Sequence, residues 1–406
     1  MKKFFKKNKR RFFLSSLLSF FLVPFFFKKI NSYELSDFEK QTGFKNYGSP
    51  SKFERIFRWI MSSPALKGNG SSYSPLSKLE GTIFPNGLHF ERHHYGVFDS
   101  NPNNYFIEII DKNEIIDISL KELKSMEISS VKTFIECGGN SMSMYNKVPV
   151  RNSVDLIHGL ISYSEWSGVT LKNLFSRYSY KKIDKYKWIE FESFDKGNYN
   201  ISIPYDQAYE KAFLALYQNG EAIRPEQGYP IRLIIPGWEG STHVKWVSKI
   251  KLRDKPIYSR NETSKYTDLM INGKARQFSF KMETKSIILK PSVGQGVKLG
   301  NNIITGLAWS GTSTIKLVQV SLNSGLSWNE CKLNEQHIES NFKRFLYEFD
   351  WNGEEIIIQS RCIDNDGYVQ PSRKKFLSVM GYNAKYHFNA ITSWKINKDG
   401  SVDHVY

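Results

Sequence analysis

The chain changes character near residue 285, and this change limits the folds that its 406 residues can adopt. Beyond "KSIILKPSVGQG", short apolar segments rich in β-branched residues are separated by the turn sequences "NSG", "NGE" and "DNDG". Regular short strands with such turns are typical of a β-sandwich. The expected strands are "STIKLVQVSLN", "RFLYEFDW" and "EEIIIQSRCIDN", and no helix of useful length is expected in this part.

The preceding part mixes helix and strand patterns and is predicted to be α+β. The segment "PYDQAYEKAFLALYQNG" predicts a helix that begins at Pro204 and stops at Gly220, whereas "YPIRLIIPG" and "VKWVSKIKL" predict strands. A chain of this length divides into two or three domains. We expect a loop-rich wrapping segment at 31–75, an α+β domain at 76–285 and the sandwich at 286–406.

The formal charge of +17 is concentrated at the N-terminus. Residues 1–30 hold nine Lys or Arg and no acid, and without these nine charges the formal charge falls to +8. The basic stretch leads into an apolar run, 17–27, that is too short to span a bilayer, so no stable membrane insertion is expected. Arg10 and Arg11 resemble a twin-arginine export signal. We therefore predict a signal peptide at 1–30 and a periplasmic protein; an ordinary secretory signal or an uncleaved anchor is the alternative.

The remaining positive charge suits an anionic substrate or an acidic partner as well as nucleic acid. No nucleic-acid motif accompanies it, so nucleic-acid binding is not expected. The chain also has no C-x-x-C-H, so no haem is expected in it.

Three cysteines, Cys137, Cys331 and Cys362, make an odd number. An exported chain of this kind keeps at least one thiol free or pairs it outside the chain. Cys331 and Cys362 could form a disulfide, which leaves Cys137 over.

Cys137 ends an apolar run in "TFIECGGNSMS" and is followed by two glycines. It could be half of a disulfide, a nucleophile that needs a histidine base, a metal ligand or an inert buried thiol. A zinc site needs several Cys or His at ligand spacing, and "ERHHYG" offers only an adjacent pair. A soft metal held mainly by a non-protein sulfur ligand needs one protein thiolate, and glycines would leave room for a bulky cofactor. The inert thiol stays open as the alternative.

Five segments in order resemble the sulfite oxidase family of molybdenum enzymes: "GLHFERHHYGV", "FIECGGNS", "SEWSGVTL", "YQNGEAIRPEQGYPIRLIIPGWEG" and "HVKWVSKIKL". The sulfane dehydrogenase subfamily is the most similar, and "YGSPSKFE", "QPSRKKF" and "YHFNAITSWKI" extend the resemblance over most of the chain. The resemblance implies a sulfite-oxidase-type molybdopterin-binding domain followed by an immunoglobulin-like β-sandwich dimerisation domain.

The resemblance also implies roles for eleven residues. Cys137 would bind molybdenum beside the pyranopterin dithiolene, Arg92 would reach the substrate anion, and Tyr266 would lie beside the reacting oxygen. The cofactor would be held by Phe90, Arg92, His93 and His94 along its length, by Asp195 near the pterin, and by Arg232, His243 and Lys245 on the pterin and its phosphate. Gln227 in "EQGYP" stands where animal sulfite oxidases have histidine, and it cannot titrate. Without the motifs, each of these residues could be an ordinary surface charge, a turn residue or a packed aromatic.

By resemblance, the chain is the molybdenum subunit of a periplasmic sulfane dehydrogenase in thiosulfate oxidation. It would oxidise sulfane sulfur bound to a carrier protein and pass electrons singly to a c-type cytochrome subunit, with a homodimer at the core. The alternatives are a sulfite dehydrogenase acting on free sulfite, a sulfoxide reductase, and a basic exported binding protein without catalysis.

Overall fold

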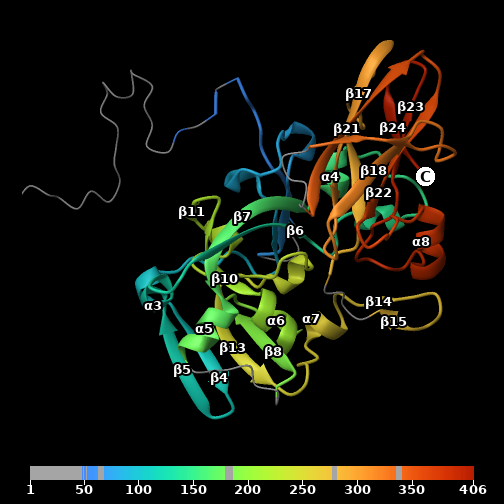
Figure 1. The fold of residues 1–406 in the computed structure, drawn as a ribbon. Coiled ribbons are helices and arrows are strands. Elements are labelled where there is room, and N and C mark those ends of the chain that lie inside the picture. The colour runs from blue at the N-terminus through green and yellow to red at the C-terminus, as the bar shows by residue number, and fades with distance from the viewer. Residues whose placement is uncertain are drawn as a thin grey trace, which may run out of the picture. The chain divides into compact units, whose positions relative to one another are not determined.

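The computed structural model describes residues 48, 50–51, 53–62, 68–178, 186–276, 281–334 and 341–406 (Figure 1). The predicted signal peptide lies outside these residues. The chain divides into two units, 1–55 and 56–406, and all the described helices and strands belong to the second. Within the described residues, no helix is long and apolar enough to cross a membrane.

Two sheets of five strands build the part between residues 106 and 253. One has the order β11-β10-β7-β6, with β12 also paired to β10, and the other has the order β5-β4-β13-β8-β9. Only β13 and β4 run parallel in these two sheets. The strands are β4 (Phe106–Asp111), β5 (Glu114–Ser119), β6 (Ser129–Glu136), β7 (Ile161–Thr170), β8 (Trp188–Ser193), β9 (Asn200–Pro204), β10 (Phe213–Gln218), β11 (Glu221–Ala222), β12 (Arg232–Ile234) and β13 (Val247–Arg253).

Short helices and a small antiparallel sheet complete this part. The sheet consists of β1 (Trp59–Ser62), β2 (Gly70–Tyr73) and β3 (Glu91–His93). The α-helices are α3 (Leu120–Lys124), α4 (Val154–His158), α5 (Leu171–Arg177), α6 (Tyr205–Lys211) and α7 (Arg260–Thr263). The 3₁₀ turns are η2 (Leu76–Lys78), η3 (Asn86–Leu88), η4 (Pro102–Asn104), η5 (Met142–Tyr145), η6 (Pro225–Gln227) and η7 (Gly240–Thr242).

The last third forms two antiparallel sheets, which confirms the predicted β-sandwich after an α+β part. The orders are β16-β17-β21-β20 and β19-β18-β22-β23-β24, and the orange to red strands gather with helix α8 in Figure 1. The elements are β14 (Asp268–Leu269), β15 (Ala275–Arg276), β16 (Lys285–Lys290), β17 (Gly300–Trp309), β18 (Ile315–Ser321), β19 (Asn329–Glu330), β20 (Lys332–Leu333), β21 (Phe342–Trp351), β22 (Ile356–Asp364), α8 (Arg373–Met380), β23 (Ser393–Ile396) and β24 (Val402–Val405). β14 and β15 form a separate hairpin.

One hydrophobic cluster joins this sandwich to the earlier part of the chain. Phe342 stacks on Tyr163 with ring centroids 4.7 Å apart, and its ring lies 6.2 Å from Phe84 and 6.2 Å from Trp309. The two parts therefore share a buried core rather than meeting only at a linker. The exact domain boundaries at 75 and 285 stay a prediction.

The helix predicted from 204 to 220 is wrong in its second half. Helix α6 ends at Lys211, Ala212 is extended with φ −82° and ψ 149°, and Phe213–Gln218 is strand β10. A continuous apolar run fits a buried strand as well as a helix. Pairing of β10 with β7 and β12 on its two sides decides the outcome, because a central strand can be apolar on both faces.

The expectation that the last third contains no helix is also wrong. Helix α8 begins after Ser372, whose side chain accepts a hydrogen bond from the Lys375 N–H, and it buries Phe376, Leu377 and Met380. Eight residues give too few turns for the helical period to stand out in the sequence. The possible disulfide between Cys331 and Cys362 is not formed: both are buried free thiols.

We expect Phe342→Ala to lower the free energy of unfolding by about 3–5 kcal/mol, the usual cost of removing a fully buried aromatic ring. Denaturant unfolding followed by circular dichroism measures this change. Leu326→Ala is the control, because Leu326 is 86% exposed and its loss should change stability by less than about 0.5 kcal/mol. Equal effects of the two substitutions would contradict the shared core.

Candidate active site

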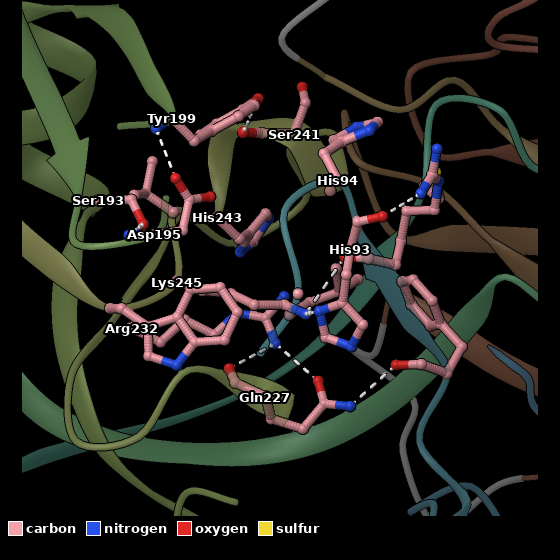
Figure 2. A pocket seen from close by; sticks show the side chains of 18 of the residues that line it. His93, His94, Ser193, Asp195, Tyr199, Gln227, Arg232, Ser241, His243 and Lys245 are labelled. Atoms are coloured by element: carbon pink, nitrogen blue, oxygen red, sulfur yellow. Dashed lines mark hydrogen bonds between the residues drawn. The ribbon is translucent and has the colours of Figure 1, made fainter. Parts of the chain in front are cut away.

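All eleven residues singled out in the sequence line one pocket of about 700 Å³, part of which is open to solvent (Figure 2). They come from β3 and the residues on either side of it, the residue after β6, the loop after β8, η6, β12, the segment after η7 and the segment after α7. Ser193, Tyr199, Ser241 and Trp246 also line the pocket and were missed. Trp246 lies in the family segment "HVKWVSKIKL" and Ser241 lies just before it, so this part of the resemblance could have pointed to both.

Cys137 directly follows strand β6, in a loop that backbone hydrogen bonds hold on both sides of the cysteine. Its N–H donates to the Leu160 carbonyl at 3.0 Å, and the Asn140 N–H donates to the Cys137 carbonyl at 2.8 Å. A Cβ on Gly138 would lie 2.1 Å from Glu239 Oε1, so this glycine makes room for a protein side chain and not for a cofactor. A Cβ on Gly139 would meet only the Cys137 Sγ within 4 Å, so the second glycine is the one beside the thiol.

The Cys137 thiol shares the pocket with a fixed guanidinium, that of Arg92. Burial raises the pKa of this thiol, and the positive charge of Arg92 acts in the opposite direction. Arg92 Nη1 donates to Asn69 Oδ1 at 2.7 Å, to the Gly70 carbonyl at 3.2 Å and to the His93 carbonyl. Because these bonds hold one nitrogen of the guanidinium to strand β2 and its neighbours, the cation is preorganised in the pocket.

The histidines of the pocket are neutral at physiological pH. Burial, with the charges of Lys245 and Arg92, lowers the pKa of His93 to about 2. Burial and Arg92 lower the pKa of His94 to about 3, and its Nε2 lies 3.4 Å from the Tyr266 hydroxyl. Burial and the Arg232 charge lower the pKa of His243 to about 3.

The bonds of His243 fix its tautomer. The Ile235 N–H donates to Nδ1 at 3.4 Å, so Nε2 carries the proton, and it lies 3.2 Å from the Trp238 carbonyl. Protonation of Nδ1 would break the first of these bonds.

Two further cations line the pocket, Arg232, which is buried, and Lys245, which is partly buried. Arg232 is 3% exposed, and its Nη1 donates to Gln227 Oε1 at 2.8 Å, while Gln227 Nε2 donates to the Phe90 carbonyl at 2.9 Å, as Figure 2 shows. Lys245 Nζ donates to the Glu226 carbonyl at 2.7 Å. Burial lowers the pKa of Arg232 to about 9 and that of Lys245 well below its ordinary value.

Within the described part of the chain, neither Arg232 nor Lys245 forms an ion pair with a carboxylate, and Arg232 Nε has no hydrogen-bond partner. Buried cations without a counter-charge are costly, so the site is suited to an anionic group such as a phosphate.

Asp195 and Tyr266 shape two sides of the pocket. Asp195 Oδ1 accepts from the N–H groups of Gly197 and Tyr199, both at 3.0 Å, so this carboxylate organises its own loop. The Tyr199 hydroxyl donates to the Ser241 carbonyl at 2.9 Å. Tyr266 has φ 55° and is 8% exposed. Its ring lies 5.1 Å from that of Tyr386, in the C-terminal part of the chain.

The chain matches two family models. The model of the oxidoreductase molybdopterin binding domain matches residues 94–261, and that of the Mo-co oxidoreductase dimerisation domain matches residues 276–394. Mitochondrial sulfite oxidase of Rattus norvegicus is 26% identical over 339 residues, which cover 77% of this chain and 62% of that protein. The Homo sapiens enzyme is 27% identical over 337 residues, covering 76% and 62%. The chain thus spans less than two thirds of the length of these relatives.

A solved structure is similar over almost the whole chain. The sulfane dehydrogenase SoxCD from Paracoccus pantotrophus has a TM-score of 0.84 and 34% sequence identity, covering 93% of this chain and 96% of that chain.

The low pKa of His243 predicts a pH dependence of stability. Its pKa is about 3 in the folded chain and about 6.5 in the unfolded chain. Below pH 6.5 the unfolded state therefore binds more protons than the folded state, and the free energy of unfolding decreases as the pH is lowered. Between pH 7.5 and 5.0 this one residue should contribute a loss of about 2 kcal/mol. Denaturant unfolding of the wild type and of His243→Gln measures it: the wild type should lose about that much more than the variant. Parallel pH curves would contradict a neutral His243.

Proposed function

The chain belongs to the sulfite oxidase family of molybdopterin oxidoreductases, and from that premise we propose that it is the molybdenum subunit of a sulfane dehydrogenase. The observation that carries the proposal is a single pocket that holds the partly buried Cys137, the guanidinium of Arg92 and two further cations. Within the described residues, neither of these two cations, Arg232 and Lys245, forms an ion pair with a carboxylate. The sulfane dehydrogenase SoxCD, at 34% identity, supports the choice of substrate class.

The residues of the pocket fit a molybdenum–molybdopterin cofactor. The Cys137 thiolate is a soft ligand of the kind such a metal takes. Arg232, with its free Nε, and Lys245 would hold the phosphate, and His243 would line the pterin. Gln227 would keep Arg232 oriented without changing charge, because an amide does not titrate.

When bound, the cofactor supplies two-electron oxidation with transfer of oxygen to sulfur. Arg92 would hold the oxyanion that grows on the sulfur, since guanidinium groups bind such anions through charge-assisted hydrogen bonds. The Tyr266 hydroxyl, 3.4 Å from His94 Nε2, would donate toward the reacting oxygen. Neutral His94 with its proton on Nε2 would donate to the hydroxyl oxygen, which orients the hydroxyl and leaves its own proton for the reacting oxygen.

The remaining parts of the proposal concern partners and place. The sulfur would arrive as a persulfide on a cysteine of a carrier protein, and the electrons would leave to a c-type cytochrome subunit, because the sequence holds no C-x-x-C-H of its own. The match of residues 276–394 to a dimerisation domain supports a homodimeric core. Arg10 and Arg11 support twin-arginine export to the periplasm.

A sulfite dehydrogenase acting on free sulfite is the second candidate. The similarity to mitochondrial sulfite oxidases favours it, since the chemistry on the metal would be the same. The substrate of steady-state turnover separates the two.

We expect Cys137→Ser to lose bound molybdenum and activity. Loss of a side chain that only hydrogen-bonds a metal ligand typically costs about 10- to 100-fold in metal affinity or activity, and removal of the ligand itself should cost at least as much. Metal analysis of the purified protein and turnover with a cytochrome acceptor measure this. Cys331→Ser is the matched control and should keep the metal. Full molybdenum content and activity in Cys137→Ser would refute the ligand assignment.

We expect wild-type enzyme with a c-type cytochrome to turn over thiosulfate-loaded carrier faster than free sulfite.

Arg92→Gln should lower kcat/KM for the carrier-bound substrate by about 10- to 100-fold, the equivalent of one charge-assisted hydrogen bond. Arg253→Gln, at a half-exposed arginine paired with Glu190 outside the pocket, should leave kcat/KM unchanged. Preference of the wild type for free sulfite would overturn the sulfane dehydrogenase proposal in favour of the second candidate.

A further inference from the structure

Lys285, in the C-terminal part of the chain, contacts the residues on either side of the Cys137 loop. This lysine is the first residue of β16 and is 1% exposed. Its Nζ lies 2.9 Å from Glu136 Oε1 and donates to Ser141 Oγ at 2.8 Å. Glu136 directly precedes Cys137 and Ser141 ends the loop, so one ammonium group holds both ends of the segment that carries the thiol.

Both oxygens of the Glu136 carboxylate accept hydrogen bonds. Oε2 accepts from Trp309 Nε1 at 2.6 Å, and Oε1 accepts from Asn140 Nδ2 at 2.9 Å as well as from Lys285. Ser141 Oγ also lies 2.7 Å from His158 Nδ1. Trp309 and Lys285 belong to neighbouring strands of one sheet of the sandwich, β17 and β16, and are aligned partners in it.

A second contact from the C-terminal part reaches the same loop. The His387 N–H donates to the Gly138 carbonyl at 2.8 Å, and its Nε2 lies 2.9 Å from Glu239 Oε2, which is fully buried. His387 has φ 56°, an uncommon conformation for a residue with a side chain. Residues from beyond position 284 therefore hold three points: Glu136 at the end of β6, Gly138 in the loop and Ser141 at the end of the loop.

Stability alone is a poor account of this arrangement. A buried ion pair gives little net stability compared with apolar side chains of the same volume, because both charges lose their hydration. Side chains that hold a metal ligand from behind, by contrast, strongly affect metal affinity and reactivity. The contacts of Lys285 converge on the loop of the single half-exposed cysteine among the described residues.

We propose that Lys285 is a positioning residue for Cys137, which it orients through Glu136 and Ser141, so that the β-sandwich sets the geometry of the metal ligand in addition to any role in dimerisation. The inference rests on the proposed function insofar as Cys137 binds molybdenum. It requires no contact between Lys285 and substrate or cofactor.

The test compares three variants of the purified enzyme. Lys285→Met removes the ammonium, and the double variant Glu136→Gln with Lys285→Met leaves no unpaired charge behind. Ser141→Ala removes the hydroxyl that bonds both Lys285 and His158. Lys251→Met is the matched control, because Lys251 forms an ion pair with Glu190 and Glu192 in another sheet and does not line the pocket. The readouts are molybdenum per chain, the electron paramagnetic resonance spectrum of the half-reduced metal, kcat and KM, and hydrogen exchange of the amides at 137–141.

We expect the double variant to fold and to lose metal affinity or kcat by about 10- to 100-fold, with a changed resonance spectrum and faster exchange at 137–141. Ser141→Ala should show the same changes to a smaller extent, and Lys251→Met none of them. If Lys285→Met and the double variant do not fold, Ser141→Ala decides the outcome alone.

An unchanged spectrum, metal content and exchange rate in a folded double variant, or in Ser141→Ala where that variant decides, would overturn the proposal and leave Lys285 a purely structural residue. Absence of molybdenum from the wild type would instead overturn the proposed function. In that case the exchange of 137–141 still decides whether Lys285 fixes the loop.

Discussion

The buried ion pair between Glu136 and Lys285 joins the two halves of the chain at the point where the candidate metal ligand lies. Both side chains are 1% exposed, and residues separated by 149 positions meet at 2.9 Å. Such a pair is tolerated only where further hydrogen bonds satisfy both charged groups. Trp309, Asn140 and Ser141 supply them, so the sandwich must be in place before the Cys137 loop has its final geometry. The shared hydrophobic cluster serves the same end by holding β17 and β6 together.

The electrostatics of the pocket follow from an excess of cations, of which Arg232 is buried and the others are partly buried. Arg92, Arg232 and Lys245 line it, and the one predicted acid, Asp195, spends a carboxylate oxygen on its own loop. These cations act together with burial to keep His93, His94 and His243 neutral. An anionic ligand would raise the lowered pKa values of Arg232 and Lys245 again, because an opposite charge favours the protonated lysine and guanidinium. The pocket is thus built to be completed by negative charge.

The sequence allowed good predictions wherever a local pattern carried the information. Alternating residues predicted β13, β18, β21 and β22, and the family resemblance as a whole predicted eleven residues that line one pocket. Phe213–Gln218 was misassigned because an apolar run does not reveal whether partner strands flank it, and only the pairing with β7 and β12 resolves this.

The residues behind the Cys137 loop could not be predicted, for a different reason. Glu239 and His387 lie in family segments and Lys285 does not, but nothing near any of the three in the sequence marks its partner. Each becomes significant only through a contact formed when the sandwich packs on the first half of the chain.

Charge also bears on which sulfur compound the site can take. Among the charged groups, Arg92 is the cation that acts most strongly on the Cys137 thiol. A small free anion must be held entirely by groups inside the pocket, and burying it is costly unless its charge is fully paired. A sulfur atom carried on a partner protein brings binding energy from contacts outside the pocket, which can position it at the reacting centre. We infer that a single well-fixed guanidinium is sufficient for the second kind of substrate, because it has only to hold the oxygens that accumulate as the reaction proceeds.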